Sequence, residues 1–151
     1  MKKQLSKIVL LALVLFSGCT QKIVKVDSET YFDNQEAYND KNTIITADLV
    51  EVVDNNHLFE GKWIEIKAPI THFEERDSPA WYLIFEKDGR KIRAYENDFL
   101  GWVPPDAAYL ARWAKHEGGD VTALGKILKG TIELDELTYK DFIVNTSAIP
   151  T

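Results

Sequence analysis

The chain has 151 residues, of which 45% are hydrophobic and 28% charged, and this predicts one folded domain with room for a short leader or linker. Its formal net charge is −6 and its basic residues are scattered among acidic ones, which argues against nucleic-acid binding. The single cysteine excludes an internal disulfide and a multi-thiolate metal site. Because His57, His72 and His116 are not closely paired in the sequence, we expect no metal and no cofactor.

The first 18 residues form a basic and then apolar leader. Lys2, Lys3 and Lys7 precede an uncharged run, Ile8–Phe16. This run is much shorter than the roughly 20 residues of a membrane-spanning helix. We therefore expect residues 1–18 to be a signal peptide that is removed, which leaves 15 basic against 24 acidic residues and a formal charge of −9.

A cysteine follows the leader directly, after the small pair Ser17-Gly18. This ending resembles the lipobox of bacterial lipoproteins, although Phe16 stands where leucine is usual. The resemblance implies lipidation of Cys19 with palmitate-like chains and a membrane anchor that faces the periplasm or the cell exterior. Thr20, in place of a retention-type aspartate, implies the outer membrane in a cell with two membranes. The alternative is an ordinary signal peptide and a free thiol, which is a liability in an oxidising compartment.

The mature chain begins with a polar segment, residues 19–42, in which Asp and Asn interrupt any sustained period, and we expect a tether there. The folded domain is expected at residues 43–151. Thr46 is the predicted N-cap of a short helix that ends at Asn55. From Lys62 to Ile70 apolar and polar residues alternate, which predicts a half-buried strand.

The remaining elements are predicted from β-rich runs and from turn residues. Trp81–Phe85 and Lys91–Glu96 form a predicted hairpin around Asp88-Gly89. A helix over 106–117 follows two prolines and ends at Gly118-Gly119. Two last strands are predicted within 120–134 and 137–148, with a turn at Asp135-Glu136 between them.

This order of elements resembles the OB-fold. The resemblance implies a mainly β, small five-stranded OB-like barrel with a helix between strands 3 and 4 and a short helix before strand 1. About two-thirds of the chain is also similar to the tRNA-anticodon-like OB proteins of unknown function. That similarity rests on short motifs: Asn55, Phe59-Glu60-Gly61-Lys62, Gly118-Gly119-Asp120-Val121 and Gly125-Lys126.

OB barrels commonly bind along the exposed face of strands 2 and 3. If Leu83 and Phe85 point inward, then Tyr82 and Ile84 point outward, and Arg93 and Tyr95 join them from the paired strand. Such rings could stack on a base or a sugar, and the guanidinium could pair with a carboxylate or phosphate. Trp63, which also leaves the inward parity, is a further candidate ligand-binding residue. The competing interpretation is that these rings only cover the sheet.

The sequence leaves three functions open. The first is a non-catalytic binding or adaptor lipoprotein that recognises a protein or an envelope polymer such as a glycan. The second is an envelope hydrolase whose carboxylates meet His72 or His116 only in the fold. The third is a single-stranded nucleic-acid binder, which the OB resemblance suggests but charge and export oppose. We expect the first: no enzyme, no catalytic residue, a membrane contact through lipid on Cys19, and no nucleic-acid partner.

Overall fold

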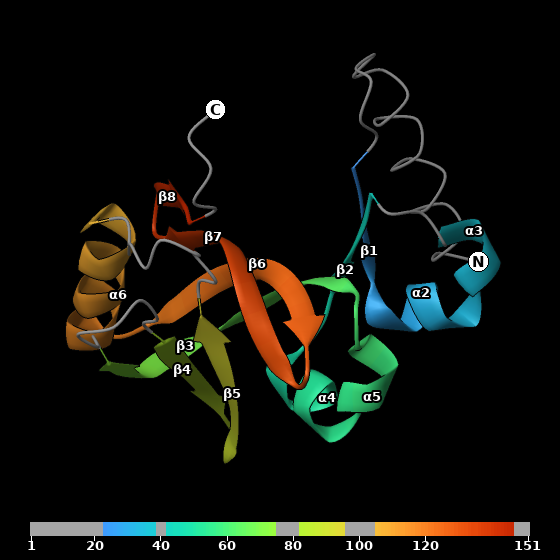
Figure 1. Ribbon diagram of the computed structural model, residues 1–151, viewed down its shortest axis with the longest axis horizontal. Helices are drawn as coiled ribbons and strands as arrows, with labels where there is room; N and C mark the ends of the chain where they lie inside the picture. Colours follow the sequence, from blue (N-terminus) through green and yellow to red (C-terminus); the bar gives the residue numbers. More distant parts are fainter. Residues whose placement is uncertain (1–22, 39–41, 75–81, 96–104, 147–151) are drawn as a thin grey trace. The chain divides into compact units, whose positions relative to one another are not determined.

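The computed structural model describes residues 23–38, 42–74, 82–95 and 105–146 (Figure 1). The chain divides into two compact units, residues 1–46 and residues 47–151. We expected the folded domain to begin at residue 43, and the strand that begins at Thr43 lies in the first of these units.

The first unit contains two short parallel strands with helical turns between them. β1 (Val24–Asp27) pairs with β2 (Thr43–Thr46) in a register that places Val24 opposite Thr43. The helices α2 (Ser28–Asp33) and α3 (Gln35–Tyr38) follow β1 directly. Asp27 caps α2: its Oδ1 accepts a hydrogen bond from the Thr30 backbone N–H at 2.8 Å and its Oδ2 one from the Thr30 hydroxyl at 2.9 Å.

Where we expected a tether over residues 19–42, the structure has a strand and two short helices within residues 24–38. These elements are too short to show a hydrophobic period in the sequence. They are stabilised by the Asp27 cap and by the pairing of β1 with β2, whose residues are distant in the sequence. A usable signal exists, because Asp27 followed by Ser28 and Glu29 is a helix-start pattern.

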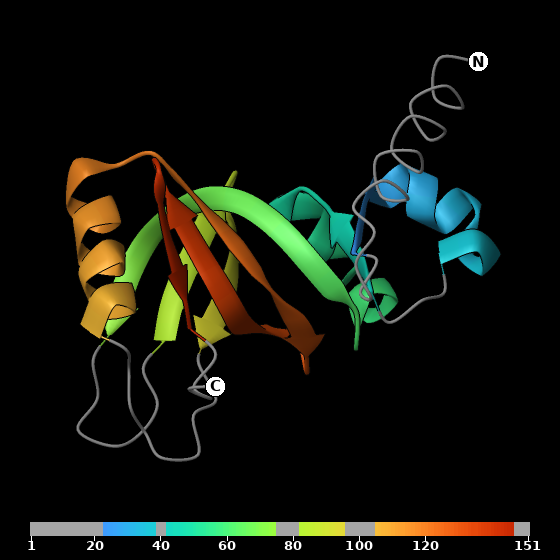
Figure 2. The ribbon, with the colours of Figure 1, turned by 90° about the horizontal axis from the view of Figure 1, so that it is seen from above.

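The second unit is built on a closed ring of five strands. Each strand pairs with the next, and the ring order is β3, β4, β5, β7, β6 and back to β3. The strands are β3 (Trp63–Glu74), β4 (Tyr82–Lys87), β5 (Arg90–Tyr95), β6 (Asp120–Leu128) and β7 (Thr131–Tyr139). All pairs in the ring are antiparallel except β5–β7, which is parallel. Figure 2 shows β3 as a long curved strand, and this strand pairs with β4 and with β6.

Helices flank this barrel at two places (Figures 1 and 2). α6 (Pro105–Glu117) lies between the third and fourth ring strands in the chain and contacts β3, β7 and the edge strand β8 (Phe142–Asn145). Before the first ring strand come α4 (Leu49–Asp54) and α5 (Asn56–Phe59). Closure, strand order and helix position are those of an OB-fold, so the predicted mainly β OB-like barrel is confirmed.

Most of the predicted elements lie within a few residues of their observed bounds. The short helix starts later than expected, since its N-cap is Asp48 rather than Thr46. The hairpin between β4 and β5 turns at Asp88-Gly89 as predicted, and both residues have positive φ. α6 ends at Gly118 and Gly119, with φ of 83° and 92°, conformations that glycine adopts without strain.

The prediction of a turn at Asp135-Glu136 is wrong. The β6–β7 hairpin turns at Lys129-Gly130, with φ of 52° and 75°, and β7 runs on through Asp135 to Tyr139. Gly125 faces Leu134 while Leu124 faces Glu136, so Asp135 is an extra residue on β7, a β-bulge. Because of the bulge, the alternation of buried and half-buried residues along β7 is interrupted at Asp135 and Glu136. In the sequence this interruption looks the same as a turn between two strands.

The barrel core is filled by inward-facing side chains from every ring strand and from the helices. Those with almost no exposure include Leu49, Phe59, Ile64, Ile66, Leu83, Phe85, Ile127, Ile132 and Leu137. Alternate residues of the strands are buried, which fixes the outward direction of the residues between them. The outer faces of the barrel are therefore defined by the sequence parity of each strand.

Candidate ligand-binding face

The outer surface of the β4–β5 hairpin carries the side chains predicted to bind a ligand. Leu83 and Phe85 on β4, and Ile92 and Ala94 on β5, are buried as expected. Tyr82 lies directly opposite Tyr95, and Ile84 lies directly opposite Arg93. Directly opposed side chains on one face of a sheet have Cβ atoms about 5 Å apart. The structure therefore brings Tyr82, Arg93 and Tyr95 together on one face.

Arg93 is exposed and extends over a neighbouring ring. Its guanidinium carbon lies 4.5 Å from the centre of the Tyr82 ring, which is a cation–π contact. The His72 ring, on β3, lies 6.1 Å from the Tyr82 ring at an interplanar angle of 33°, and His72 is in register with Ile84. We call Tyr82, Ile84, Arg93, Tyr95 and His72 the β4–β5 outer face.

This face is a partly apolar surface that carries the positive charge of Arg93. The three rings present π surfaces, and Arg93 presents donors in a planar fork that suits carboxylate or phosphate. In the described part of the chain, no acidic side chain forms an ion pair with Arg93, whereas Lys91 nearby is 3.7 Å from Glu86. The Arg93 guanidinium thus contacts the Tyr82 ring, whereas the neighbouring Lys91 is paired with Glu86.

The predicted face and the observed face differ by two residues. The sequence suggests His72 only as an acid–base candidate. The direction of its side chain depends on the irregular register of β3 between Ile70 and His72, which the sequence pattern does not reveal. Trp63 points outward as predicted, but it lies nine residues before His72 and is opposite Lys126 of β6. The structure does not bring Trp63 to the β4–β5 outer face.

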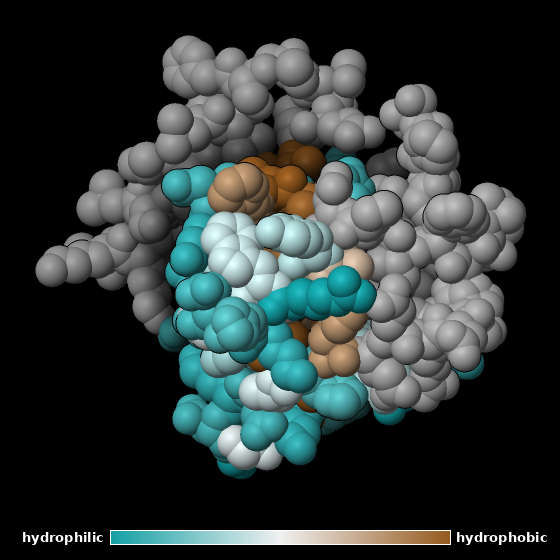
Figure 3. Space-filling model, turned by 90° about the vertical axis from the view of Figure 1, so that its left-hand side faces the viewer, coloured by the Kyte–Doolittle hydropathy of each residue, from teal (hydrophilic) through white to brown (hydrophobic). Residues whose placement is uncertain are grey.

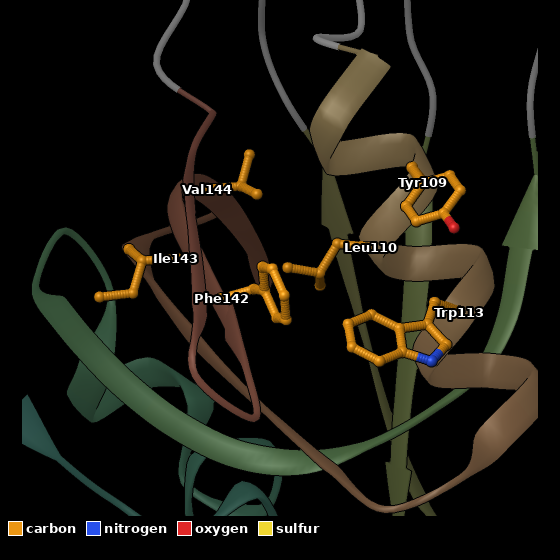
Figure 4. A pocket seen from close by; sticks show the side chains of 6 residues that line it. All are labelled: Tyr109, Leu110, Trp113, Phe142, Ile143 and Val144. Atoms are coloured by element: carbon orange, nitrogen blue, oxygen red, sulfur yellow. The ribbon is translucent and has the colours of Figure 1, made fainter.

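An apolar groove between α6 and β8 has no counterpart among the sequence predictions (Figures 3 and 4). Its volume is about 380 Å³, and it is lined by Tyr109, Leu110, Trp113, Phe142, Ile143 and Val144. The rings of Trp113 and Phe142 face each other edge to face at 5.3 Å. Phe142 and Ile143 are 60% and 66% exposed, unusual for such large apolar residues. The sequence pattern of this last strand indicates only a strand, not an exposed apolar surface.

Cys19, the predicted lipidation site, lies outside the described residues, as does the acidic stretch after Glu74. Among the residues that the structure describes, no helix has the length and apolar character needed to cross a bilayer. Within the same residues, no group of three or more potential ligands is placed to hold a metal ion.

Comparison with known proteins gives structural matches only. No protein-family model matches the sequence, and no curated protein sequence matches it. Among solved structures, a complex of TiaS with tRNA and ATP matches 68% of this chain at 7% identity and a TM-score of 0.41. Asparaginyl-tRNA synthetase from Pyrococcus horikoshii matches 62% of this chain at 13% identity and a TM-score of 0.41. An OBody bound to hen egg-white lysozyme matches 58% of this chain at 12% identity and a TM-score of 0.39.

These matches correct one expectation. We expected no nucleic-acid partner; structural neighbours that include a complex with tRNA and a tRNA synthetase stand against that exclusion, and it is withdrawn. The matched region spans 22% and 21% of those two chains and 84% of the OBody. At such low identities and TM-scores, the matches carry no argument about which ligand this chain binds.

Proposed function

We propose that this chain is a bacterial envelope lipoprotein, anchored through lipid on Cys19, whose OB-like barrel is a non-catalytic binding or adaptor module for a protein or an envelope polymer. The anchor part rests on the leader: a basic start, a short apolar run and Ser17-Gly18 before the cysteine. Lipid anchoring contributes roughly 0.8 kcal/mol per buried methylene, so the two or three chains typical of such a cysteine would hold the protein at the membrane.

The observation that carries the binding role is the position of Arg93 over Tyr82, opposite Ile84 and beside Tyr95. A guanidinium that already lies over a ring can bind an anionic or aromatic group of a partner. Because its side chain is held in place by the ring, little side-chain entropy is lost when that partner binds. The chemistry of the face is that of recognition: stacking, apolar contact and charge-assisted hydrogen bonding.

Site-directed photo-crosslinking in intact cells tests this role. A photoreactive residue replaces Ile84, which lies at the centre of the face and leaves Tyr82, Arg93 and Tyr95 intact. A control carries it at Lys115, an exposed position on α6. We expect a discrete adduct from position 84 that is absent from position 115 and is lost when Arg93→Ala is added. Mass spectrometry of the adduct then identifies a protein or a glycan.

Two results would contradict the binding role of this face. One is the same adduct pattern from positions 84 and 115. The other is an adduct at position 84 that persists in Arg93→Ala and in Tyr82→Ala/Tyr95→Ala. A nucleic-acid adduct would keep the face as the binding surface but would replace the proposed class of partner and, with it, the envelope location. Thermal unfolding of each variant verifies that lost crosslinking does not come from lost folding.

A further inference from the structure

A second hollow lies on a different part of the barrel, on the outer face of β3, β6 and β7. Its volume is about 410 Å³, and its lining includes Lys67, Gly119, Asp120, Thr122, Thr138 and Lys140. None of these residues belongs to the β4–β5 outer face. The size is in the range of small-molecule sites and is larger than a bare ion needs.

The floor of this hollow is a row of polar side chains across three strands. Lys67 of β3 is opposite Thr122 of β6, and Thr122 is opposite Thr138 of β7. Their neighbours along each strand are buried, so all three side chains point outward on the same face. Opposed positions are about 5 Å apart, and the row therefore places one ammonium and two hydroxyls within reach of a single small molecule.

The wall of the hollow is held by interlocking contacts. The Tyr139 hydroxyl donates a hydrogen bond to the Gly118 carbonyl oxygen at 2.6 Å, which ties the glycine turn after α6 to β7. The Tyr139 ring packs edge to face on Trp113 at 4.9 Å. The Lys140 ammonium lies 5.0 Å from the Trp113 ring centre and 5.3 Å from the Tyr139 ring centre. The second cation is thus positioned before any ligand arrives, which lowers the entropic cost of binding.

The charges of the hollow define the class of ligand. In the part of the chain that the structure describes, neither Lys67 nor Lys140 has an acidic side chain at ion-pair distance, although the protein as a whole is acidic. Two ammonium groups against the single Asp120 carboxylate leave the lining with a net positive charge, which favours a carboxylate or a phosphate. Thr122, Thr138 and the Asp120 carboxylate instead suit hydroxyl groups, since threonine both donates and accepts and aspartate accepts.

We propose that this hollow, which we call the β3–β6–β7 pocket, binds an anionic sugar: a sugar ring that bears a carboxylate or a phosphate. Lys67 and Lys140 hold the anionic group, and the two threonines with Asp120 hold ring hydroxyls. This site does not depend on the role of the β4–β5 outer face.

Saturation-transfer NMR and calorimetry with the full chain in detergent test the proposal. The probes are glucuronate and glucose 6-phosphate, with glucose and inorganic phosphate as the neutral and bare-anion controls. We expect at least one anionic sugar to bind about tenfold more tightly than either control. Lys67→Gln and Lys140→Gln should each weaken that binding about tenfold, as expected for the loss of a charge-assisted hydrogen bond. Lys115→Gln, an exposed lysine outside the pocket, should leave it unchanged.

The proposal fails if neither anionic sugar binds, or if glucose binds as tightly as both of them. It also fails if inorganic phosphate matches glucose 6-phosphate, because the pocket would then be a simple anion site. Equal weakening by Lys115→Gln would indicate a general charge effect and would likewise overturn it. Arg93→Ala distinguishes the two sites, since it should abolish crosslinking from position 84 and leave sugar binding intact.

Discussion

The carboxylate of Asp48 joins two elements at once: it caps α4 and it binds Lys87 at the end of β4. One oxygen accepts a hydrogen bond from the Val50 backbone N–H at 2.9 Å, and the other accepts one from the Lys87 ammonium at 2.5 Å. A second exposed pair, Arg90 with Asp54, links the same helix to β5. The first helix of the barrel unit is therefore attached to the hairpin that carries the β4–β5 outer face.

Replacement of Asp48 should separate the cap from the ion pair. Asp48→Ala removes both and should lower the free energy of unfolding by about 1 kcal/mol, mainly through the lost cap. Asp48→Asn keeps a good capping side chain and should lower it clearly less. Urea unfolding of both variants at neutral pH measures the difference. Equal losses in the two variants would mean that the ion pair, rather than the cap, provides the stabilisation.

The same carboxylate gives a pH test. The hydrogen bond from Lys87 is the main reason that the pKa of Asp48 is lowered from its usual 3.8. A depressed pKa means that the stabilising charge is present above the unfolded-state pKa and is lost as pH falls through the lower folded-state pKa. The stability gap between wild type and Asp48→Asn should therefore close on acidification. A gap that stays constant down to the acid limit of folding would contradict this coupling.

Gly125 lies where β6 passes close to β7. A methyl group built there would lie 2.6 Å from Cγ2 of Ile132 and would overlap the Glu133 carbonyl oxygen. Gly125→Ala should therefore push the two strands apart at the Asp135 bulge and cost about 1–3 kcal/mol, as overpacking does. Lys126→Ala, one residue along and half-buried, is the control and should change stability little. Chemical unfolding that gives similar midpoints for both variants would show that the strands relax without cost.

The barrel was largely predictable because its strands obey simple parity. Ile64, Ile66, Leu83 and Phe85 alternate with residues that point outward, and this pattern alone fixed which side chains of β4 and β5 leave the core. Local turn chemistry at Asp88-Gly89 was equally readable. Tyr82, Arg93 and Tyr95 could therefore be assigned to the candidate ligand-binding face from the sequence. His72 was missed, and Trp63 lies elsewhere on the barrel.

What could not be predicted depends on register and on contacts distant in sequence. The bulge at Asp135 and the irregular register near His72 shift parity by one residue, and a linear pattern cannot separate a bulge from a turn. The β3–β6–β7 pocket needs Lys67, Thr122 and Thr138 to become cross-strand neighbours. Nothing local in these residues indicates that alignment.

Replacement of the predicted anchor residue tests the proposed location. Cys19→Ser should abolish metabolic labelling with a clickable palmitate analogue and move the protein from the membrane fraction to the soluble fraction, because a serine hydroxyl cannot form the thioether that carries the lipid. Thr20→Ser, which leaves the cysteine intact, should retain both label and membrane fractionation. Unchanged fractionation of Cys19→Ser would mean that something other than lipid on this residue holds the protein at the membrane.

Asp135 should give the opposite pH dependence to Asp48. Burial raises the pKa of this carboxyl above 3.8, since desolvation disfavours its charged form. Between the unfolded-state and folded-state pKa values the folded chain binds more protons, so the contribution of Asp135 to stability falls as pH rises through that window and stays lower above it. Asp135→Asn should therefore gain stability relative to wild type as pH rises from about 3 to about 7, measured by thermal unfolding across that range. Glu136→Gln removes the same charge from the neighbouring position and controls for net charge; an identical pH profile for both variants would show that burial of Asp135 is not the cause.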